Sequence, residues 1–184
     1  MIIEKSALII NKKGMAGTTL SDIMDATKLA KGGIYGNFQS KDEIYVESFF
    51  YLTQSLSDTL DTIAEKGKTA KEKLFSLLDF YKGNKPAEGG CPLLNFGVEA
   101  DDTHPEMKAH VKMAIRASQK RIFNIIMLGI AEKEVSPDIH PKNFSLKVFA
   151  TIEGAILCRR VFASDDQMNL VIDSIKQEFE IYLM

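Results

Sequence analysis

The residues best suited to binding chemistry lie close together, between positions 19 and 41. Thr19 precedes an apolar series and can cap a helix whose free amide groups face a phosphate. Lys31 and Lys41 supply cations that pair with phosphates, and the hydroxyl or ring of Tyr35 can contact a nucleic-acid backbone. Asn37 carries an amide that can pair with a base edge such as that of adenine. This group of side chains predicts contact with duplex DNA.

Three short helices are expected to carry these side chains, over residues 2–12, about 20–26 and about 31–37. The first ends near Gly14, and the third buries Ile34 and Phe38, which lie one turn apart. Two short helices that cross steeply and are braced by a third place a recognition helix in the major groove. Gly33 lies in that third helix with two other glycines, which together weaken it by roughly 2–3 kcal/mol and leave few side chains on its reading face.

The order of residues in this segment is similar to that of a known family. The segment resembles the TetR family of bacterial one-component regulators in Gly14, in the run Thr18-Thr19-Leu20-Ser21-Asp22-Ile23, and in the run Leu29-Ala30-Lys31-Gly32-Gly33-Ile34-Tyr35-Gly36-Asn37-Phe38-Gln39-Ser40-Lys41-Asp42-Glu43-Ile44. The resemblance implies that Thr19, Tyr35 and Lys41 contact the DNA backbone of an operator. Two positions depart from the family pattern, because Lys28 replaces the usual turn glycine and Ala30 replaces the usual serine cap.

The rest of the chain is also predicted to be helical, which makes the fold class all-α. Ser or Thr followed three residues later by Glu or Gln marks a helix start, and this pattern occurs at Ser40/Glu43, Thr69/Glu72, Thr103/Glu106 and Ser164/Gln167. Loops are expected at about 84–92 and 133–141, where prolines and glycines gather. We expect a three-helix helix-turn-helix head over residues 1–46 and a helical body for ligand binding and dimerisation over residues 47–184.

The composition restricts the class of protein further. The chain has 184 residues, of which 45% are hydrophobic and 26% charged, and its net charge of −2 argues only weakly against a nucleic-acid partner. The two cysteines are too few for a disulfide framework, and neither an export signal nor a membrane span is expected. We therefore expect a cytoplasmic protein.

The last two helices are expected to form a homodimer. The segment from about Pro141 to Ala163 is apolar nearly all round, so it must be covered on more than one side. With an amphipathic helix from about Asp165 to Leu183 it can form half of a four-helix bundle. The alternative is a core within one chain. The predicted interface consists of Phe149, Ala150, Gly154, Cys158, Val171, Ile175 and Phe179.

The middle of the chain encloses an effector pocket in the family that the sequence resembles. Aromatic, flexible and polar side chains that could receive a largely apolar small molecule are Tyr51, Phe80, Tyr81, Asn95, Phe96, Glu99, Met107, Met113 and Phe123. Each can also be an ordinary core or surface residue. A hydrogen bond from Asn95 to the neighbouring loop and exposure of Glu99 to solvent are the alternatives for the two polar candidates.

No cofactor or metal site is expected, since the three histidines do not share a helical face. No catalytic motif is present, so the chain is not expected to be an enzyme. The favoured prediction is a ligand-responsive transcriptional repressor that binds a palindromic operator as a dimer. The alternative is a helical protein-interaction module that has lost specific DNA binding.

Overall fold

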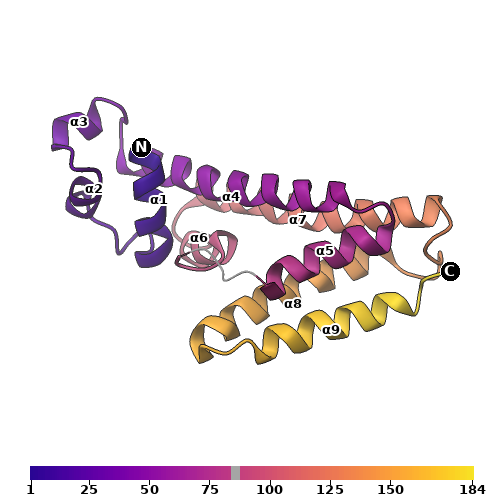
Figure 1. Cartoon of the computed structure of the whole chain (residues 1–184). Helices are drawn as coiled ribbons and strands as arrows, with labels where there is room; N and C mark the ends of the chain where they lie inside the picture. Colours follow the sequence, from indigo (N-terminus) through magenta and orange to yellow (C-terminus); the bar gives the residue numbers. More distant parts are fainter. Residues whose placement is uncertain (84–87) are drawn as a thin grey trace. The chain divides into compact units, whose positions relative to one another are not determined.

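The computed structural model describes residues 1–83 and 88–184. Regular secondary structure in these residues is helical apart from one isolated bridge between Val135 and Leu183, as the all-α prediction required (Figure 1). The helices are α1 (Ile2–Lys13), α2 (Leu20–Thr27), α3 (Lys31–Tyr35), α4 (Lys41–Lys66), α5 (Ala70–Gly83), α6 (Pro92–Ala100), α7 (Pro105–Ala131), α8 (Pro141–Phe162) and α9 (Asp166–Glu180). No helix of the described residues is long and apolar enough to cross a bilayer.

Three helix starts have the caps that the sequence predicts. Before α2, the Thr19 hydroxyl accepts a hydrogen bond from the Asp22 amide, and the Asp22 carboxylate accepts one from the Thr19 amide. Before α4, the Ser40 hydroxyl accepts from the Glu43 amide at 3.1 Å. Before α5, the Thr69 hydroxyl accepts from the Glu72 amide at 3.1 Å. Each bond satisfies an amide that has no partner inside its own helix.

The other two predicted caps are wrong, and one helix was not predicted as a separate element. At α7 the helix begins after His104, whose Nδ1 accepts from the Met107 amide at 3.2 Å, while the Thr103 hydroxyl donates to the carbonyl of Glu99. At α9 the Ser164 hydroxyl accepts from the amide of Asp166, not from that of Gln167. Helix α6 begins with a proline at its first position, where proline favours a helix start.

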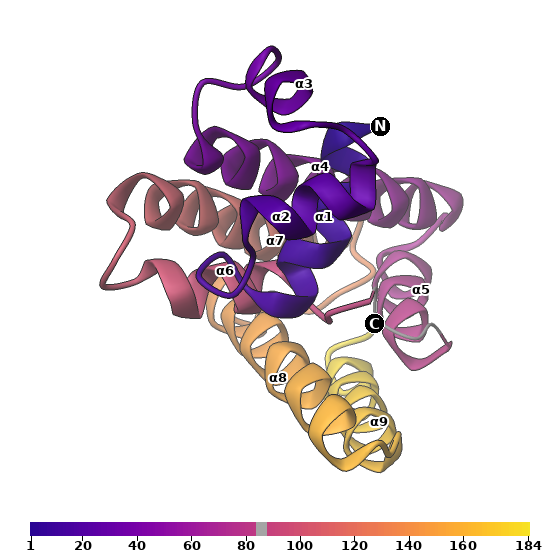
Figure 2. The same ribbon diagram turned by 90° about the vertical axis from the view of Figure 1, so that its left-hand side faces the viewer.

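The described chain packs as two compact units. The first contains residues 1–56 and 88–114, and the second contains residues 57–83 and 115–184. The expected boundary at residue 46 does not coincide with this division, because α6 and the first part of α7 pack with the N-terminal helices. In the first unit α1 contacts both α2 and α6, and α2 contacts α3; α1 and α2 are seen together in Figure 2.

The second unit is built on α8, α9 and α5. Helices α8 and α9 lie side by side, and α5 packs against α9 (Figures 1 and 2). The ring of Phe179 lies 5.7 Å from that of Phe144 and 6.3 Å from that of Phe75, measured between centroids. Lysine–carboxylate pairs join α5 to α9 at Lys71–Glu180, Lys82–Asp173 and Lys176–Asp79.

Arg159 of α8 holds the C-terminal end of α5. Its guanidinium donates to the carbonyl oxygens of Tyr81 at 2.7 Å and Lys82 at 3.1 Å, and it pairs with Asp165. These carbonyls belong to the last turn of α5, where no intrahelical donor remains. Only 8% of Arg159 is exposed, so its bonds to the two carbonyls are partly shielded from water.

Replacing this arginine is expected to destabilise the protein substantially. Arg159→Ala should lower the free energy of unfolding by about 2–4 kcal/mol, because it removes the donors of two partly buried carbonyls and the packed volume of a buried side chain. Chemical denaturation measures the change. Arg160→Ala is the matched control, since Arg160 is exposed, and it should change stability by less than about 0.5 kcal/mol. Equal losses for the two variants would contradict the role given to Arg159.

Candidate nucleic-acid interface

The start of α2 is capped by the side chains of Thr19 and Asp22. Asp22 accepts from the Thr19 amide and from the Thr19 hydroxyl, both at 2.8 Å, and pairs with Lys13 at 2.6 Å. The hydrogen bond from Lys13, and then those from Thr19, hold the pKa of Asp22 well below its ordinary value of 3.8. The Thr19 hydroxyl is therefore engaged inside the cap. The groups that α2 offers to a phosphate are the amides of Leu20 and Ser21, which precede the first intrahelical bond.

The cap should make the stability of the head depend on pH in acid. Because the folded pKa of Asp22 lies below the unfolded value, its contribution is complete above about pH 4–5 and is lost as the pH falls toward the folded pKa. The difference in unfolding free energy between wild type and Asp22→Asn should therefore be smaller at about pH 3 than at about pH 7. Denaturant titrations at both pH values measure it. A difference that grows in acid would contradict the cap.

Helix α3 presents the predicted reading face. Ile34 is fully buried and anchors the helix, while Gly33, Tyr35 and Asn37 are exposed. The helix ends at Tyr35, two residues earlier than predicted, and Phe38 is only half-buried. One buried side chain thus holds a short helix whose opposite side faces solvent.

Asn37 is engaged at the end of this helix. Its Nδ2 donates to the Gly33 carbonyl at 2.8 Å, which satisfies a carbonyl of the last turn. Pairing with both groups of an adenine edge needs the amide nitrogen and the amide oxygen together. For Asn37 to read a base in this way, its side chain must release Gly33.

The two lysines differ in how freely they can reach a phosphate. Lys31 is exposed and its Nζ lies 5.8 Å from the ring centroid of Tyr35, so the two side chains form one cationic and aromatic surface. Lys41 is half-buried, donates to the Thr18 carbonyl at 3.3 Å and lies 5.2 Å from the Tyr45 ring. An ammonium has three donors. Lys41 can therefore hold the loop between α1 and α2 at Thr18 and still donate a hydrogen bond to a phosphate.

Lys28 ends α2 in a left-handed conformation. Its φ is 60° and its ψ is 28°, and its amide donates to the Met24 carbonyl at 2.8 Å. This is the position at which the resemblance to the TetR family leads one to expect glycine. A lysine side chain raises the energy of the left-handed conformation by about 1–2 kcal/mol, whereas glycine adopts it freely.

Lys28→Gly is accordingly expected to stabilise the head. The unfolding free energy should rise by about 1 kcal/mol, less the greater chain entropy of glycine in the unfolded state. Lys28→Ala is the matched control because it removes the same charge and keeps a Cβ. If Lys28→Ala stabilised the protein as much as Lys28→Gly, relief of charge repulsion and not of backbone strain would be the cause.

Most of the residues predicted to line an effector pocket do not line the pocket that the structure contains. Asn95 donates to the Gly89 carbonyl at 2.8 Å, the loop bond given above as its alternative. Glu99 accepts from the amides of Met15 and Ala16, so it is directed neither at a cationic ligand nor simply at solvent. The remaining candidates of the first unit are either fully buried or exposed on helix surfaces: Phe96 and Met107 in the core, Tyr51 and Met113 outside. Phe80 and Phe123 are half-buried and do not line the pocket described next.

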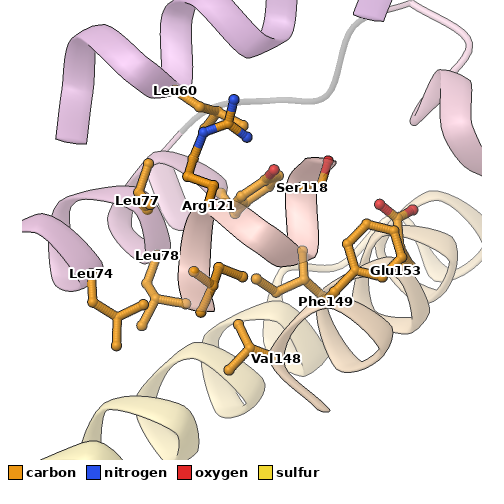
Figure 3. Close-up of a pocket in the computed structure, with 12 residues that line it drawn as sticks. Leu60, Leu74, Leu77, Leu78, Ser118, Arg121, Val148, Phe149 and Glu153 are labelled. Atoms are coloured by element: carbon orange, nitrogen blue, oxygen red, sulfur yellow. The ribbon is translucent and has the colours of Figure 1, made fainter. Parts of the chain in front are cut away.

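A pocket lies within the second unit, between side chains of α4, α5, α7 and α8 (Figure 3). Its volume is about 40 Å³. It is lined by Leu60, Leu74, Leu77, Leu78, Tyr81, Ser118, Arg121, Ile122, Val148, Phe149, Ile152 and Glu153. Of the predicted pocket residues it contains Tyr81, and it also contains Phe149, which was assigned to the dimer interface. The leucines were missed because their helical spacing is that of any core residue.

Arg121 is positioned beside this pocket by an ion pair. Its Nε donates to Asp61 at 2.7 Å, and its Nη2 donates to the Ser57 hydroxyl at 2.6 Å and to Asp61 at 3.0 Å. The hydrogen bond from Arg121 lowers the pKa of Asp61, against the effect of partial burial. The guanidinium is thereby fixed at the wall of an otherwise largely apolar cavity.

The predicted dimer residues do not all face outward. Ile175 and Phe179 are buried within the chain, Phe179 between Phe75 and Phe144, so their assignment to the interface is wrong. Cys158 and Val171 are half-buried, while Ala150 and Gly154 are exposed. A Cβ added to Gly154 would meet no atom of the described chain within 4 Å. The exposed large apolar residues of these two helices are instead Leu146, Leu157, Val161, Phe162 and Leu170.

Two protein-family models match the sequence. The model described as bacterial regulatory proteins, tetR family, matches residues 2–47, and the model described as tetracyclin repressor-like, C-terminal domain, matches residues 55–175. By sequence, an uncharacterized HTH-type transcriptional regulator of Lactococcus lactis subsp. lactis is 25% identical over 187 residues, covering 97% of this chain and 91% of that protein. The HTH-type transcriptional regulator TtgR of Pseudomonas putida is 23% identical over 181 residues, covering 94% and 83%.

Solved structures are similar over the whole chain. A TetR-family transcriptional regulator from Cytophaga hutchinsonii has a TM-score of 0.94 and 34% identity, covering 100% of this chain and 93% of that one. A TetR transcriptional regulator from Chloroflexus aurantiacus has a TM-score of 0.94 and 29% identity, covering 99% and 93%.

Proposed function

Because the chain belongs to the TetR family of bacterial transcriptional regulators, we propose that it is a repressor that binds a palindromic operator as a homodimer and is released by a small, largely apolar effector. It is a helix-turn-helix DNA-binding regulator of transcription. The observation that carries the proposal is that Gly33 and Tyr35 of α3, and Asn37 just beyond its end, are exposed, while the buried Ile34 anchors the helix.

In this proposal each α3 enters a major groove. Lys31 and Tyr35 contact phosphates beside the groove, the amides that begin α2 contact another, and Asn37 is the candidate reader of a base. Gly33 lets the backbone approach the DNA closely, since it has no side chain on that face. Lys41, the first residue of α4, supports the arrangement by holding the loop before α2 at the Thr18 carbonyl.

The homodimer is proposed to form through the outer faces of α8 and α9. Leu146, Ala150, Leu157 and Val161 recur at helical spacing along α8 and are exposed, and Leu170 of α9 is 68% exposed. An exposed apolar face of this length is typical of a protein interface. In a two-fold dimer the same residues come from both subunits, and two heads then bind two half-sites of a palindrome.

The effector is proposed to bind in the pocket of the second unit. A volume of about 40 Å³ is far below the roughly 300–1,000 Å³ of pockets that hold drug-sized ligands. The ligand must therefore displace lining side chains such as Leu77 and Phe149. Leu60 of the pocket belongs to α4, whose first residue is Lys41, so displacement of α4 is the proposed route from ligand to DNA. A coupling of about 1–3 kcal/mol is typical of such switches.

Selection from random duplex DNA tests this function. The full-length protein is incubated with random duplexes, bound fragments are sequenced, and their affinity is measured at several salt concentrations. We expect enrichment of a palindrome and an affinity that falls steeply with salt, because phosphate contacts release counterions. No enrichment together with a weak salt dependence would favour the protein-interaction module.

A further inference from the structure

Helix α6 holds the loop between α1 and α2 through one carboxylate. Oxygen Oε2 of Glu99 accepts from the Met15 amide at 2.6 Å and from the Ala16 amide at 3.2 Å. The approach is close, since a Cβ added to Gly14 would lie 1.7 Å from Oε1 of Glu99. Gly14 also has a φ of +82°, a conformation that glycine adopts without strain. Shape and hydrogen bonding thus fix the loop on α6.

A second contact lies one turn earlier on α6. Nitrogen Nδ2 of Asn95 donates to the side-chain oxygen of Asn11 at 3.0 Å. It also lies 2.9 Å from the carbonyl oxygen of Asn11. Asn11 is buried and donates in turn to the carbonyls of Glu88 at 2.9 Å and Gly90 at 3.0 Å. The last turn of α1 is therefore joined to α6 and to residues 88–90, which precede α6.

The loop held in this way leads directly into α2. Its other side is held by α4, because the Tyr45 hydroxyl bonds to the carbonyls of Met15 and Thr18. The Thr18 hydroxyl closes the loop on the Gly14 carbonyl at 2.7 Å. The direction in which α2 leaves the loop is thus set by two helices, of which α6 contributes the Glu99 carboxylate.

We propose that Glu99 and Asn95 are positioning residues for DNA recognition, which fix the α1–α2 loop and through it the direction of α2. The proposal rests on the proposed function. A sequence-specific complex requires the capped start of α2 to face its phosphate while α3 reads bases, so it depends on this direction. Non-specific binding depends on the number of nearby cations and tolerates variation in direction. Loss of the carboxylate should therefore reduce specific affinity selectively.

The test compares two substitutions of one residue. Glu99→Met removes both acceptor oxygens and keeps a similar length, whereas Glu99→Gln keeps one oxygen that can accept both amides. Fluorescence anisotropy is measured on the duplex selected by the wild-type protein and on a shuffled duplex of equal length. For Glu99→Met we expect at least about a tenfold loss on the selected duplex and less than about a twofold change on the shuffled one; Glu99→Gln should stay within about threefold on both.

Leu52→Ala controls for general destabilisation, since Leu52 is a buried residue of the same unit on α4. It should leave the specific affinity unchanged. If Glu99→Met binds the selected duplex as wild type does, or if Glu99→Gln or Leu52→Ala loses as much as Glu99→Met, the proposal is wrong.

Amide hydrogen exchange without DNA separates this proposal from the proposed function. In Glu99→Met, the amides of Met15, Ala16 and α2 should exchange faster than in wild type, while those of α7 should not change. If the substitution changed the exchange of both regions equally relative to wild type, the positioning role would be overturned, even if no duplex is ever selected. Failure of the wild-type protein to select any duplex, with local acceleration of exchange, would overturn the proposed function alone.

Discussion

Tyr35→Ala is expected to lower operator affinity by roughly 30- to 1,000-fold while leaving the fold and the dimer intact. The side chain is 40% exposed and lies next to Lys31 on the outer side of α3. A single phosphate or stacking contact of this kind contributes about 1–2 kcal/mol. Because a dimer loses the contact in both heads, the loss doubles to about 2–4 kcal/mol, which gives the stated range.

Gel-shift titration measures the affinity, and sedimentation measures the dimer. Tyr51→Ala is the matched control, because Tyr51 is 44% exposed and belongs to the same packing unit but lies on α4. It should bind the operator as wild type does. Undiminished retention of the operator by Tyr35→Ala would remove Tyr35 from the contact surface.

Leu157→Arg should convert the dimer to a monomer and abolish operator binding at physiological concentration. Leu157 is 50% exposed in the middle of the apolar face of α8. A two-fold axis introduces the charge twice into one interface, and an unpaired charge removed from water there costs several kcal/mol. A single head then lacks the affinity gained by linking two half-site contacts.

Leu128→Arg is the control for this experiment. It makes the same substitution at a leucine that is 46% exposed in the same unit, on α7. Sedimentation should show a dimer for Leu128→Arg and a monomer for Leu157→Arg, with circular dichroism unchanged in both. A dimeric Leu157→Arg would place the interface on another surface.

The head could be predicted closely from sequence because its determinants are local. Thr19 and Asp22 are three residues apart, and the burial of Ile34 follows from helical spacing. The strained Lys28 was identifiable by its departure from a family pattern. The short extent of α3 was not, since it depends on how Asn37 folds back onto Gly33.

The contacts of α6 and the pocket could not be predicted in the same way. Glu99 and Met15 are separated by 84 positions, and no local rule joins a carboxylate to amides at that distance. Ile175 and Phe179 were assigned to a dimer because an amphipathic helix does not reveal whether its apolar side packs within the chain or between chains. Leu74 and Leu77 line a cavity, but their spacing along the helix is the same as that of residues that fill a core, so sequence does not distinguish the two.

The packing of residues 88–114 against the N-terminal helices has a practical consequence for building chimeras. A head transplanted onto a related body with a junction at residue 46 would leave behind Asn95 and Glu99, and the recipient would have to offer its own donors and acceptors to Asn11 and Met15. Gly14 and Gly89 leave no room for a differently shaped partner, since a Cβ on Gly89 would lie 2.5 Å from the Asn11 carbonyl oxygen. The smallest part that can be transferred is therefore made of two separate segments of the chain. A chimera that exchanges DNA specificity must include α6 together with the first three helices.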